Sequence, residues 1–394
     1  KVIFNMVSKR FLSTMFTLSG SIMGAGILGL PYVFAKAGFF TGLFWLLFLG
    51  GIMIYVCLCL GEVSLRTKEV HQLTGYAEKY LGKNGKRIMF LVVVFGVYSA
   101  LLAYLIGEGQ SLSKIITGSV DSAIYFSIGF WLFMTVLLRQ GLKGLKKVET
   151  YGVMIVLILI LIIAGWYSSQ VDISNIMRFP QMDLVGMDFF SSLFFPFGVI
   201  LFAIMGFTAI PELRMEIRGS EKKLKKAIII GVLIPIIVYI IFSFVFVGVL
   251  NESVNKVATL SFFSQENIGF GGLITILLGV FTMLTSYFVL SFALMDTFKY
   301  DLKVSDFTNF FFVSAFPLLG FLVLSFFNLL DFVSILGIGG VISGGLTGML
   351  ILIMAKKAKK SRGRKPEYKM PINWFVIGLL SLIFIIGIVM QLVF

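Results

Sequence analysis

The sequence predicts an all-α integral membrane protein with eleven transmembrane helices. Of its 394 residues, 58% are hydrophobic and 13% are charged, and the mean hydropathy is +1.01. A soluble domain carries nearly twice that charged fraction, so most of this surface must face lipid. The apolar residues fall into runs of about twenty, the length at which a helix crosses the hydrocarbon core. Helices are expected because lipid offers no partner to open backbone groups.

The runs divide the chain into eleven predicted spans joined by short loops, which leaves no room for a separate soluble domain. Residues 1–394 therefore form one transmembrane domain. In chain order the spans are expected at residues 11–37, 40–66, 88–112, 122–139, 148–168, 189–217, 226–250, 270–298, 307–328, 332–355 and 371–394.

The positive charges predict the orientation of these spans. All but four of the 33 lysines and arginines lie in loops on one side of the membrane. Cytoplasmic loops carry such an excess, so we expect a cytoplasmic N-terminus and, after an odd number of spans, an extracellular C-terminus. The protein is expected in the plasma membrane. The opposite side holds only Lys36, Lys114, Arg178 and Lys256.

The same distribution explains the net charge of +14 without nucleic acid. The basic run at 356–365 is interpreted as a topology signal that also contacts anionic lipids. We expect membrane lipids as partners, with no nucleic acid and no obligate protein partner.

Few side chains suit an enzyme or a metal centre. Cys57 and Cys59 point to different sides of one apolar span, and the single histidine, His71, lies in a polar loop. A membrane-embedded enzyme needs intramembrane histidine, paired acids or a serine with a base. We therefore expect no enzyme activity and no cofactor.

The first span is weakest at its centre, in "GSIMGAGILGLP" at 20–31. Glycine costs a helix about 1 kcal/mol relative to alanine, and Pro31 cannot donate a backbone hydrogen bond. Two interpretations follow. Gly20 and Gly24 form a GxxxG pair suited to close helix packing. Alternatively the helix is broken, which offers amides to an anion and carbonyls to a cation or an ammonium group.

A second span repeats this pattern in "FAIMGFTAIPEL" at 202–213. Ile204-Met205-Gly206 repeats the Ile-Met-Gly of the first span, and Pro211 follows as Pro31 does. The two spans begin on opposite sides of the membrane because five spans separate them. Interrupted helices at corresponding positions of two inverted halves are typical of a transporter's binding site.

The eighth span carries hydroxyl groups on one face. Thr282, Thr285 and Ser286 are spaced i, i+3 and i+4. Such hydroxyls either bond back to their own helix or complete the oxygen shell of a sodium ion with carbonyls from the first break.

Acidic residues and glycines within the spans raise further hypotheses. Glu108 in the third span and Glu212 in the sixth are candidates for proton transfer or gating, or are solvated near the interfaces. Glu62 lies near a cytoplasmic span end, where water is close. The tenth span, "SILGIGGVISGGLTGML", is interpreted as a close-packing or hinge segment.

Three segments resemble one known family in the same order along the chain. "SGSIMGAGILGLPYVFAKAG" (19–38), "ILFAIMGFTAIPELRMEIRG" (200–219) and "TSYFVLSFALMD" (285–296) resemble the first, sixth and eighth helices of the amino acid–polyamine–organocation (APC) superfamily. The chain is most similar to its amino acid/auxin permease and aromatic/hydroxy amino acid permease branches.

This resemblance implies the fold of the leucine transporter, LeuT. In that fold two five-helix repeats are related by inversion, with helices 1 and 6 broken at the midplane. Here the repeats correspond to residues 11–168 and 189–355, and 371–394 is an extra C-terminal helix.

The resemblance also implies binding roles for individual residues. Tyr104 lines the substrate pocket, Phe207 forms an aromatic gate beside Gly206, and Thr208 faces the substrate's side chain. The substrate carboxylate is held by Ser21, Gly24, Ala25 and Gly26, and its ammonium group by carbonyls around Phe202, Ala203 and Met205. A sodium ion is held by carbonyls of Gly20, Met23 and Thr282 with the hydroxyls of Thr285 and Ser286.

The sequence thus predicts a secondary active transporter that imports neutral amino acids with a cation by alternating access. Sodium is favoured over a proton as the coupling ion, although proton-coupled relatives also carry a Thr-Ser pair in the eighth helix. The alternatives are a proton-coupled permease and a non-transporting amino acid sensor on the same fold.

Overall fold

The computed structural model describes residues 2–140, 145–178, 187–262, 269–299, 304–329, 331–361 and 363–393. All regular structure in these ranges is helical. Apolar composition and length drive this result, because a long apolar segment in lipid satisfies its backbone only as a helix. The long helices are α3 (Phe39–Arg66), α4 (Leu73–Thr117), α5 (Ala123–Gln140), α6 (Leu145–Tyr167), α11 (Leu224–Leu250), α12 (Phe270–Thr297), α13 (Asp306–Phe326) and α16 (Trp374–Val393). α4 is kinked at Gly82, where φ is 80° and the backbone is not helical.

Among the described residues, nine helical segments are long and apolar enough to cross a membrane. A tenth is the bent pair of Arg10–Ile22 and Ala25–Ala37. These ten coincide with ten of the eleven predicted spans. The remaining one, 148–168, corresponds to α6, whose apolar part at Met154–Gln170 is shorter than a full span. The multi-pass architecture is therefore clear, and the count of eleven stays a prediction.

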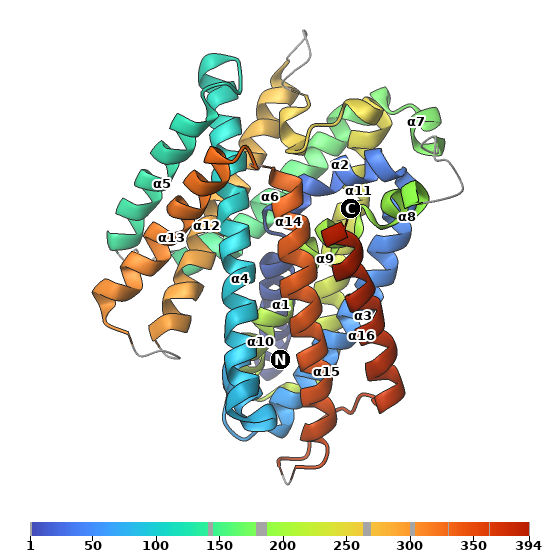
Figure 1. Ribbon diagram of the computed structural model, residues 1–394. Helices are drawn as coiled ribbons and strands as arrows, with labels where there is room; N and C mark the ends of the chain where they lie inside the picture. Colours follow the sequence, from blue (N-terminus) through green and yellow to red (C-terminus); the bar gives the residue numbers. More distant parts are fainter. Residues whose placement is uncertain are drawn as a thin grey trace.

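The spans differ in how much of their surface the rest of the protein covers. In the apolar 18-residue stretch of Phe189–Glu216 and of Phe332–Ala358, 72% and 67% is buried, whereas the share is only 17% in Trp374–Val393 and 22% in Ala123–Gln140. Figure 1 shows α5 and α13 at one edge of the molecule and α16 near the opposite edge. The peripheral helices present large apolar side chains outward, as a lipid-facing surface requires.

Two of the inner spans are interrupted. The first consists of α1 (Val2–Ile22), a 3₁₀ turn at Ala25–Gly29 and α2 (Leu30–Ala37), with a bend of 44°. The other follows α8 (Met187–Phe194) and consists of α9 (Phe197–Ala203), a 3₁₀ turn at Phe207–Ala209 and α10 (Ile210–Glu216). The two run in opposite directions in Figure 1, because α1 leads up to α2 and α9 leads down to α10.

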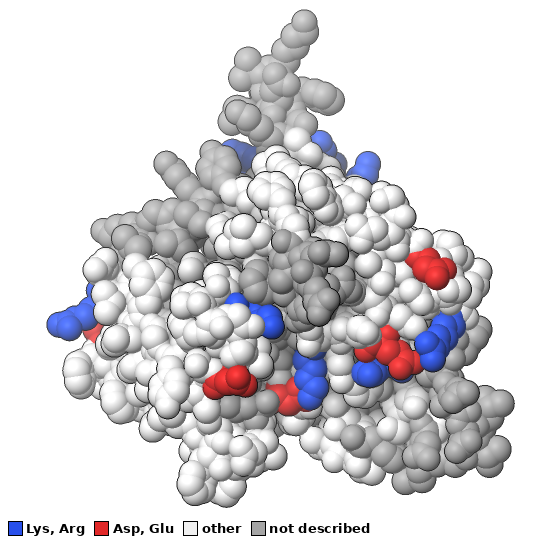
Figure 2. Space-filling model, turned by 90° about the horizontal axis from the view of Figure 1, so that it is seen from above, with Lys and Arg blue, Asp and Glu red and all other residues white. Residues whose placement is uncertain are grey.

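The upper end of the molecule carries few charges, and several of them are paired. α2, the end of α4 and the short helix α7 (Ile173–Met177) all lie there. Figure 2 shows this end as largely uncharged, with scattered basic and acidic side chains. Arg178 pairs with Glu252 at 3.2 Å and Lys256 with Asp331 at 3.1 Å. The loops expected on the less basic side therefore gather at one end.

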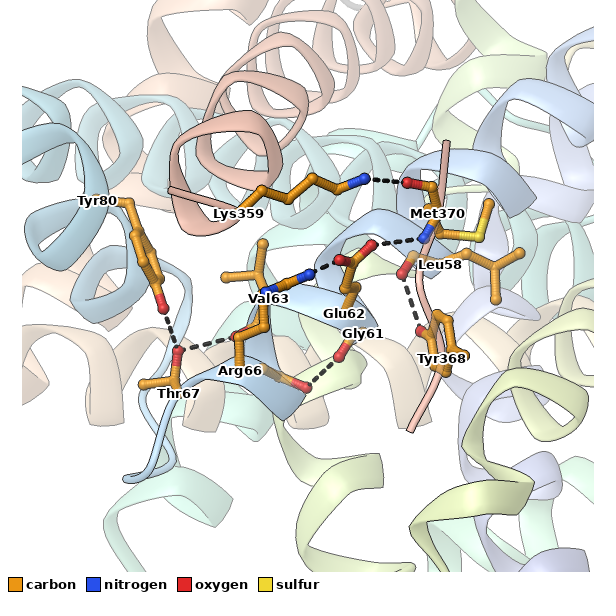
Figure 3. A network of polar contacts seen from close by, with 11 residues as sticks. Leu58, Gly61, Glu62, Val63, Arg66, Thr67, Tyr80, Lys359, Tyr368 and Met370 are labelled. Atoms are coloured by element: carbon orange, nitrogen blue, oxygen red, sulfur yellow. Dashed lines mark hydrogen bonds and ion pairs between the residues drawn. The ribbon is translucent and has the colours of Figure 1, made fainter. Parts of the chain in front are cut away.

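At the lower end, the segment before α16 is fixed to the end of α3 (Figure 3). One carboxylate oxygen of Glu62 accepts from Arg66 Nε at 2.8 Å, and the other accepts from the Met370 N–H at 2.6 Å. The Tyr368 hydroxyl donates to the Leu58 carbonyl at 2.8 Å. Glu62 lies near the end of its span, as expected, but this segment covers it and leaves it 1% exposed.

The glycines of the tenth span allow close packing, which was expected there as an alternative to a hinge. It consists of α14 (Phe332–Gly339), a π-helical turn at Gly340–Gly345 and α15 (Leu346–Ala358). A Cβ on Gly340 would collide with the Gly198 carbonyl and lie 2.8 Å from the Phe202 nitrogen. This span therefore packs on the backbone of α9, directly beside the second interruption.

This contact predicts the effect of a single added methyl group. Gly340→Ala must push α14 away from α9, and overpacking of this kind costs about 1–3 kcal/mol. We expect a lower thermal unfolding midpoint for the purified variant in detergent. Gly51→Ala on α3 is the matched control, because a Cβ there meets no atom within 4 Å. Equal midpoints for both variants would contradict the packing described here.

Candidate functional site

The first interruption follows from the glycines at the centre of the first span. The last regular bond is the Met23 N–H to the Ser19 carbonyl at 2.8 Å, after which Gly24 takes an extended conformation. The 3₁₀ turn that starts at Ala25 leaves its first amides without partners inside that turn, as at any helix start. The structure thus has the broken helix rather than packing alone.

The second interruption also consists of a helix end, a non-helical link and a 3₁₀ turn, but its chain runs in the opposite direction. α9 ends at Ala203, and Ile204, Met205 and Gly206 connect it to the next turn without helical structure. A Cβ on Gly26 would lie 2.9 Å from the Ala203 Cα, so the two interruptions meet backbone to backbone. Pro211 lies in the first turn of α10, where its missing N–H costs no hydrogen bond.

A buried tyrosine on α11 joins the two interruptions. The Tyr239 hydroxyl lies 2.8 Å from the Ile22 carbonyl and 2.9 Å from the Ala203 carbonyl. These carbonyls belong to the last residues of α1 and α9, where the regular helical bonds end. Tyr239 is fully buried, so its one proton serves two acceptors that water does not reach.

One cavity of about 170 Å³ opens where the interruptions meet, and most of the predicted binding residues line it. None of its described lining residues is acidic, basic or histidine. It therefore offers backbone groups, hydroxyls and apolar surface rather than fixed charges. The predicted residues along it are Gly20, Ser21, Met23, Gly24, Gly26, Tyr104, Phe202, Ala203, Met205, Phe207, Thr208, Thr282, Thr285 and Ser286.

Four predicted residues lie away from this lining. Ala25 is buried within the 3₁₀ turn, and Gly206 packs against Ile22, where a Cβ would lie at 2.7 Å. Glu212 is in the first turn of α10, half-buried beyond the cavity. Glu108 lines a different cavity, one helical turn beyond Tyr104 on α4.

Hydroxyl groups from two helices converge on the first interruption. A Cβ on Gly24 would lie 3.4 Å from Ser286 Oγ and 3.5 Å from the Tyr104 hydroxyl. At these distances an added Cβ would make only ordinary van der Waals contact, so the two hydroxyls lie directly beside Gly24 without requiring glycine there. The interruption is therefore lined by α4 on one side and α12 on the other.

The threonines of α12 have the back-bonded arrangement that was one of the two interpretations. Thr282 Oγ1 donates to the Leu278 carbonyl at 2.7 Å, and Thr285 Oγ1 donates to the Phe281 carbonyl at 2.9 Å. A hydroxyl that donates inward keeps its lone pairs for a second partner. Both threonines line the cavity, so back-bonding orients them and does not remove them as ligands for a cation.

Sequence reasoning missed Tyr239 and much of the cavity's wall. A signal for Tyr239 existed, because it is a lone phenol within the otherwise apolar stretch "VLIPIIVYIIF" of α11. The sequence signal for Ser343 was weaker: it carries a hydroxyl within a glycine-rich segment. The other missed lining residues are Ile22, Val93, Gly96, Val97, Ala100, Gly152, Val156, Val289 and Leu290.

Comparisons with known sequences identify amino acid permeases. The sequence profile of the tryptophan/tyrosine permease family matches residues 7–393. Glutamine transporter 2 of Aliivibrio fischeri is 26% identical over 87% of this chain and 88% of that protein. Tyrosine-specific transport system 1 of Haemophilus influenzae is 24% identical over 60% of this chain and 57% of that protein. The low affinity tryptophan permease of Escherichia coli K12 is 25% identical over 59% of this chain and 56% of that protein.

The fold also resembles a solved structure. A manganese transporter from Eremococcus coleocola aligns with a TM-score of 0.67, covering 96% of this chain and 85% of that one. The sequence identity is 12%, so this likeness concerns the fold alone.

The bridging hydroxyl predicts a measurable loss of stability. Tyr239→Phe leaves two buried carbonyls with one donor fewer, which costs about 1–3 kcal/mol. We expect a lower unfolding midpoint in detergent than for the wild type. Tyr98→Phe is the control, because that hydroxyl donates to a single carbonyl, of Phe312, at 3.1 Å. A loss for Tyr239→Phe no larger than for the control would show that the bridge is not stabilising.

Proposed function

Because the chain belongs to the tryptophan/tyrosine permease family, we propose that it imports neutral amino acids by secondary active transport coupled to a cation. The observation that carries this proposal is the shared cavity of the two interrupted helices. It brings together backbone of both interruptions and several hydroxyls in one place, and such groups bind the two ends of a zwitterion.

The substrate's charged ends are assigned to backbone groups. The carboxylate binds at Ser21, Gly24, Ala25 and Gly26, where the turn presents its first amides. The ammonium group binds carbonyls around Phe202, Ala203 and Met205. Phe207 and Tyr104 close over the substrate, and Thr208 faces its side chain.

The lining of the cavity supports a neutral substrate. A charged side chain entering this site would lose its hydration without gaining an ionic partner, since no described lining residue is charged. The related proteins are named for glutamine, tyrosine and tryptophan, whose side chains are all uncharged.

Sodium is the proposed coupling ion. Carbonyls of Gly20, Met23 and Thr282 and the hydroxyls of Thr285 and Ser286 form its oxygen shell. The supporting observation is that these five residues line one cavity beside the first interruption. Because the ion and the substrate order the same unwound backbone, their binding is cooperative.

Transport proceeds by alternating access between the inverted repeats 11–168 and 189–355, with 371–394 as an extra helix and the N-terminus in the cytoplasm. The opposite directions of the two interrupted helices support this arrangement. The protein acts in the plasma membrane.

Uptake into liposomes tests the proposed function. We expect the purified protein to accumulate one or more radiolabelled neutral amino acids when an inward sodium gradient is imposed, and not without a gradient. All amino acids are screened under separate sodium and proton gradients. Accumulation driven by protons alone would replace sodium with a proton, and binding without accumulation would identify a sensor.

The sodium site predicts the effect of removing two oxygens from α12. Thr285→Ala combined with Ser286→Ala should raise the sodium concentration for half-maximal uptake at least about tenfold, since each charge-assisted contact contributes about 1.5–3 kcal/mol. Thr275→Ala is the matched control, because that hydroxyl is also back-bonded on α12, to the Gly271 carbonyl, but lies outside the cavity. Unchanged sodium dependence in the double variant would remove sodium from this site.

A further inference from the structure

A second cavity, of about 500 Å³, lies between α4, α5 and α12 and is separate from the substrate cavity. α12 forms a wall of both: Thr282 and Ser286 face the substrate cavity, whereas Val280 and Leu284 face this one. We call it the lateral cavity. It is lined by Glu108, Leu112, Tyr125, Phe126, Gly129, Phe130, Phe133, Val280 and Leu284.

Glu108 is the only acidic or basic side chain among the described residues that line the lateral cavity. The residue is fully buried, and neither carboxyl oxygen has a hydrogen-bond partner in the described part of the chain. An ionised carboxylate is very costly in such a place, so the group stays protonated until a cation joins it. A polar group this deeply buried without a partner requires an explanation.

The rest of the lining is aromatic or aliphatic, apart from Gly129, and part of it lies on the outer surface. Four rings surround the cavity, and Tyr125 and Phe133 are 77% and 51% exposed on the outer surface. A Cβ on Gly129 would meet no atom within 4 Å, so the mouth at α5 is unobstructed. A molecule dissolved in the membrane can therefore enter from the side.

The chemistry of this lining discriminates between ligands. Inorganic cations such as calcium need several oxygen ligands, and the described lining offers one carboxyl and the Tyr125 hydroxyl. An amino acid is excluded because its own carboxylate has no partner here. Aromatic faces attract ammonium groups, and the apolar walls suit a hydrocarbon body.

We propose that the lateral cavity binds a membrane-soluble organic amine without a carboxylate, with Glu108 as its ionic partner. The amine enters uncharged, and the proton of the Glu108 carboxyl moves to its nitrogen. The product is an ammonium–carboxylate pair, so no net charge is brought into the apolar site. The hydrocarbon part lies against the rings of α5. This proposal is independent of the transported substrate and of its coupling ion.

Calorimetry on the full chain in lipid nanodiscs tests it, with 4-phenylbutylamine as the probe and empty nanodiscs subtracted. We expect saturable binding of the amine and at least about tenfold weaker binding of 4-phenylbutanol, which has the same body but forms no ion pair. Glu108→Gln should weaken amine binding by a similar factor and leave the alcohol unchanged. Equal binding of amine and alcohol, or no saturable amine binding at all, overturns the proposal.

Two further variants keep the test decisive if Glu108→Gln does not fold. Gly129→Leu fills the mouth of the lateral cavity without touching the carboxyl, and should abolish amine binding. Gly165→Leu adds the same side chain on α6, where a Cβ also meets nothing within 4 Å, and should bind as the wild type does. Amine binding that persists in Gly129→Leu places the ligand elsewhere and refutes the assignment.

Discussion

The hydroxyl of Tyr239 contacts both interrupted helices at once, and the arrangement around the cavity depends on this contact. An interruption within a lipid-immersed helix exposes carbonyls that neither water nor lipid can satisfy. α11 supplies a donor from outside, to the Ala203 carbonyl in one helix and to the Ile22 carbonyl in the other, which also accepts from the Gly24 N–H at 2.8 Å. The backbone groups around the cavity can stay non-helical because their buried neighbours have this partner.

Close packing of glycines brings these groups together. Gly26 lets the first interruption approach Ala203, and Gly340 lets the tenth span approach α9. Hydroxyls of Tyr104 on α4 and Ser286 on α12 lie beside Gly24. Segments of backbone thus pack directly against one another around the cavity. Its polar groups are therefore backbone amides and carbonyls, with hydroxyls, and not charged side chains.

Features determined by local backbone chemistry could be predicted from the sequence. Glycine, proline and the repeated Ile-Met-Gly indicated both interruptions, and the i, i+3, i+4 spacing placed Thr282, Thr285 and Ser286 on one face. Features that depend on which helices meet could not. Tyr239 and Ser343 reach the site through packing between distant segments, and Glu62 is buried by residues about three hundred positions later. Tyr104 and Glu108 are one turn apart on α4, and which cavity each of them lines likewise depends on the helices packed beside it.

α12 belongs to two cavities at once, with its hydroxyl face toward one and its apolar face toward the other. Any turn or shift of this helix changes both volumes together. Thermodynamic linkage then requires reciprocity. If a ligand in the lateral cavity changes the affinity of the central cavity for its own ligand by some factor, the central ligand changes the affinity of the lateral cavity by the same factor. The shared wall of α12 is thus the place where any coupling between the two cavities would act, equally in both directions.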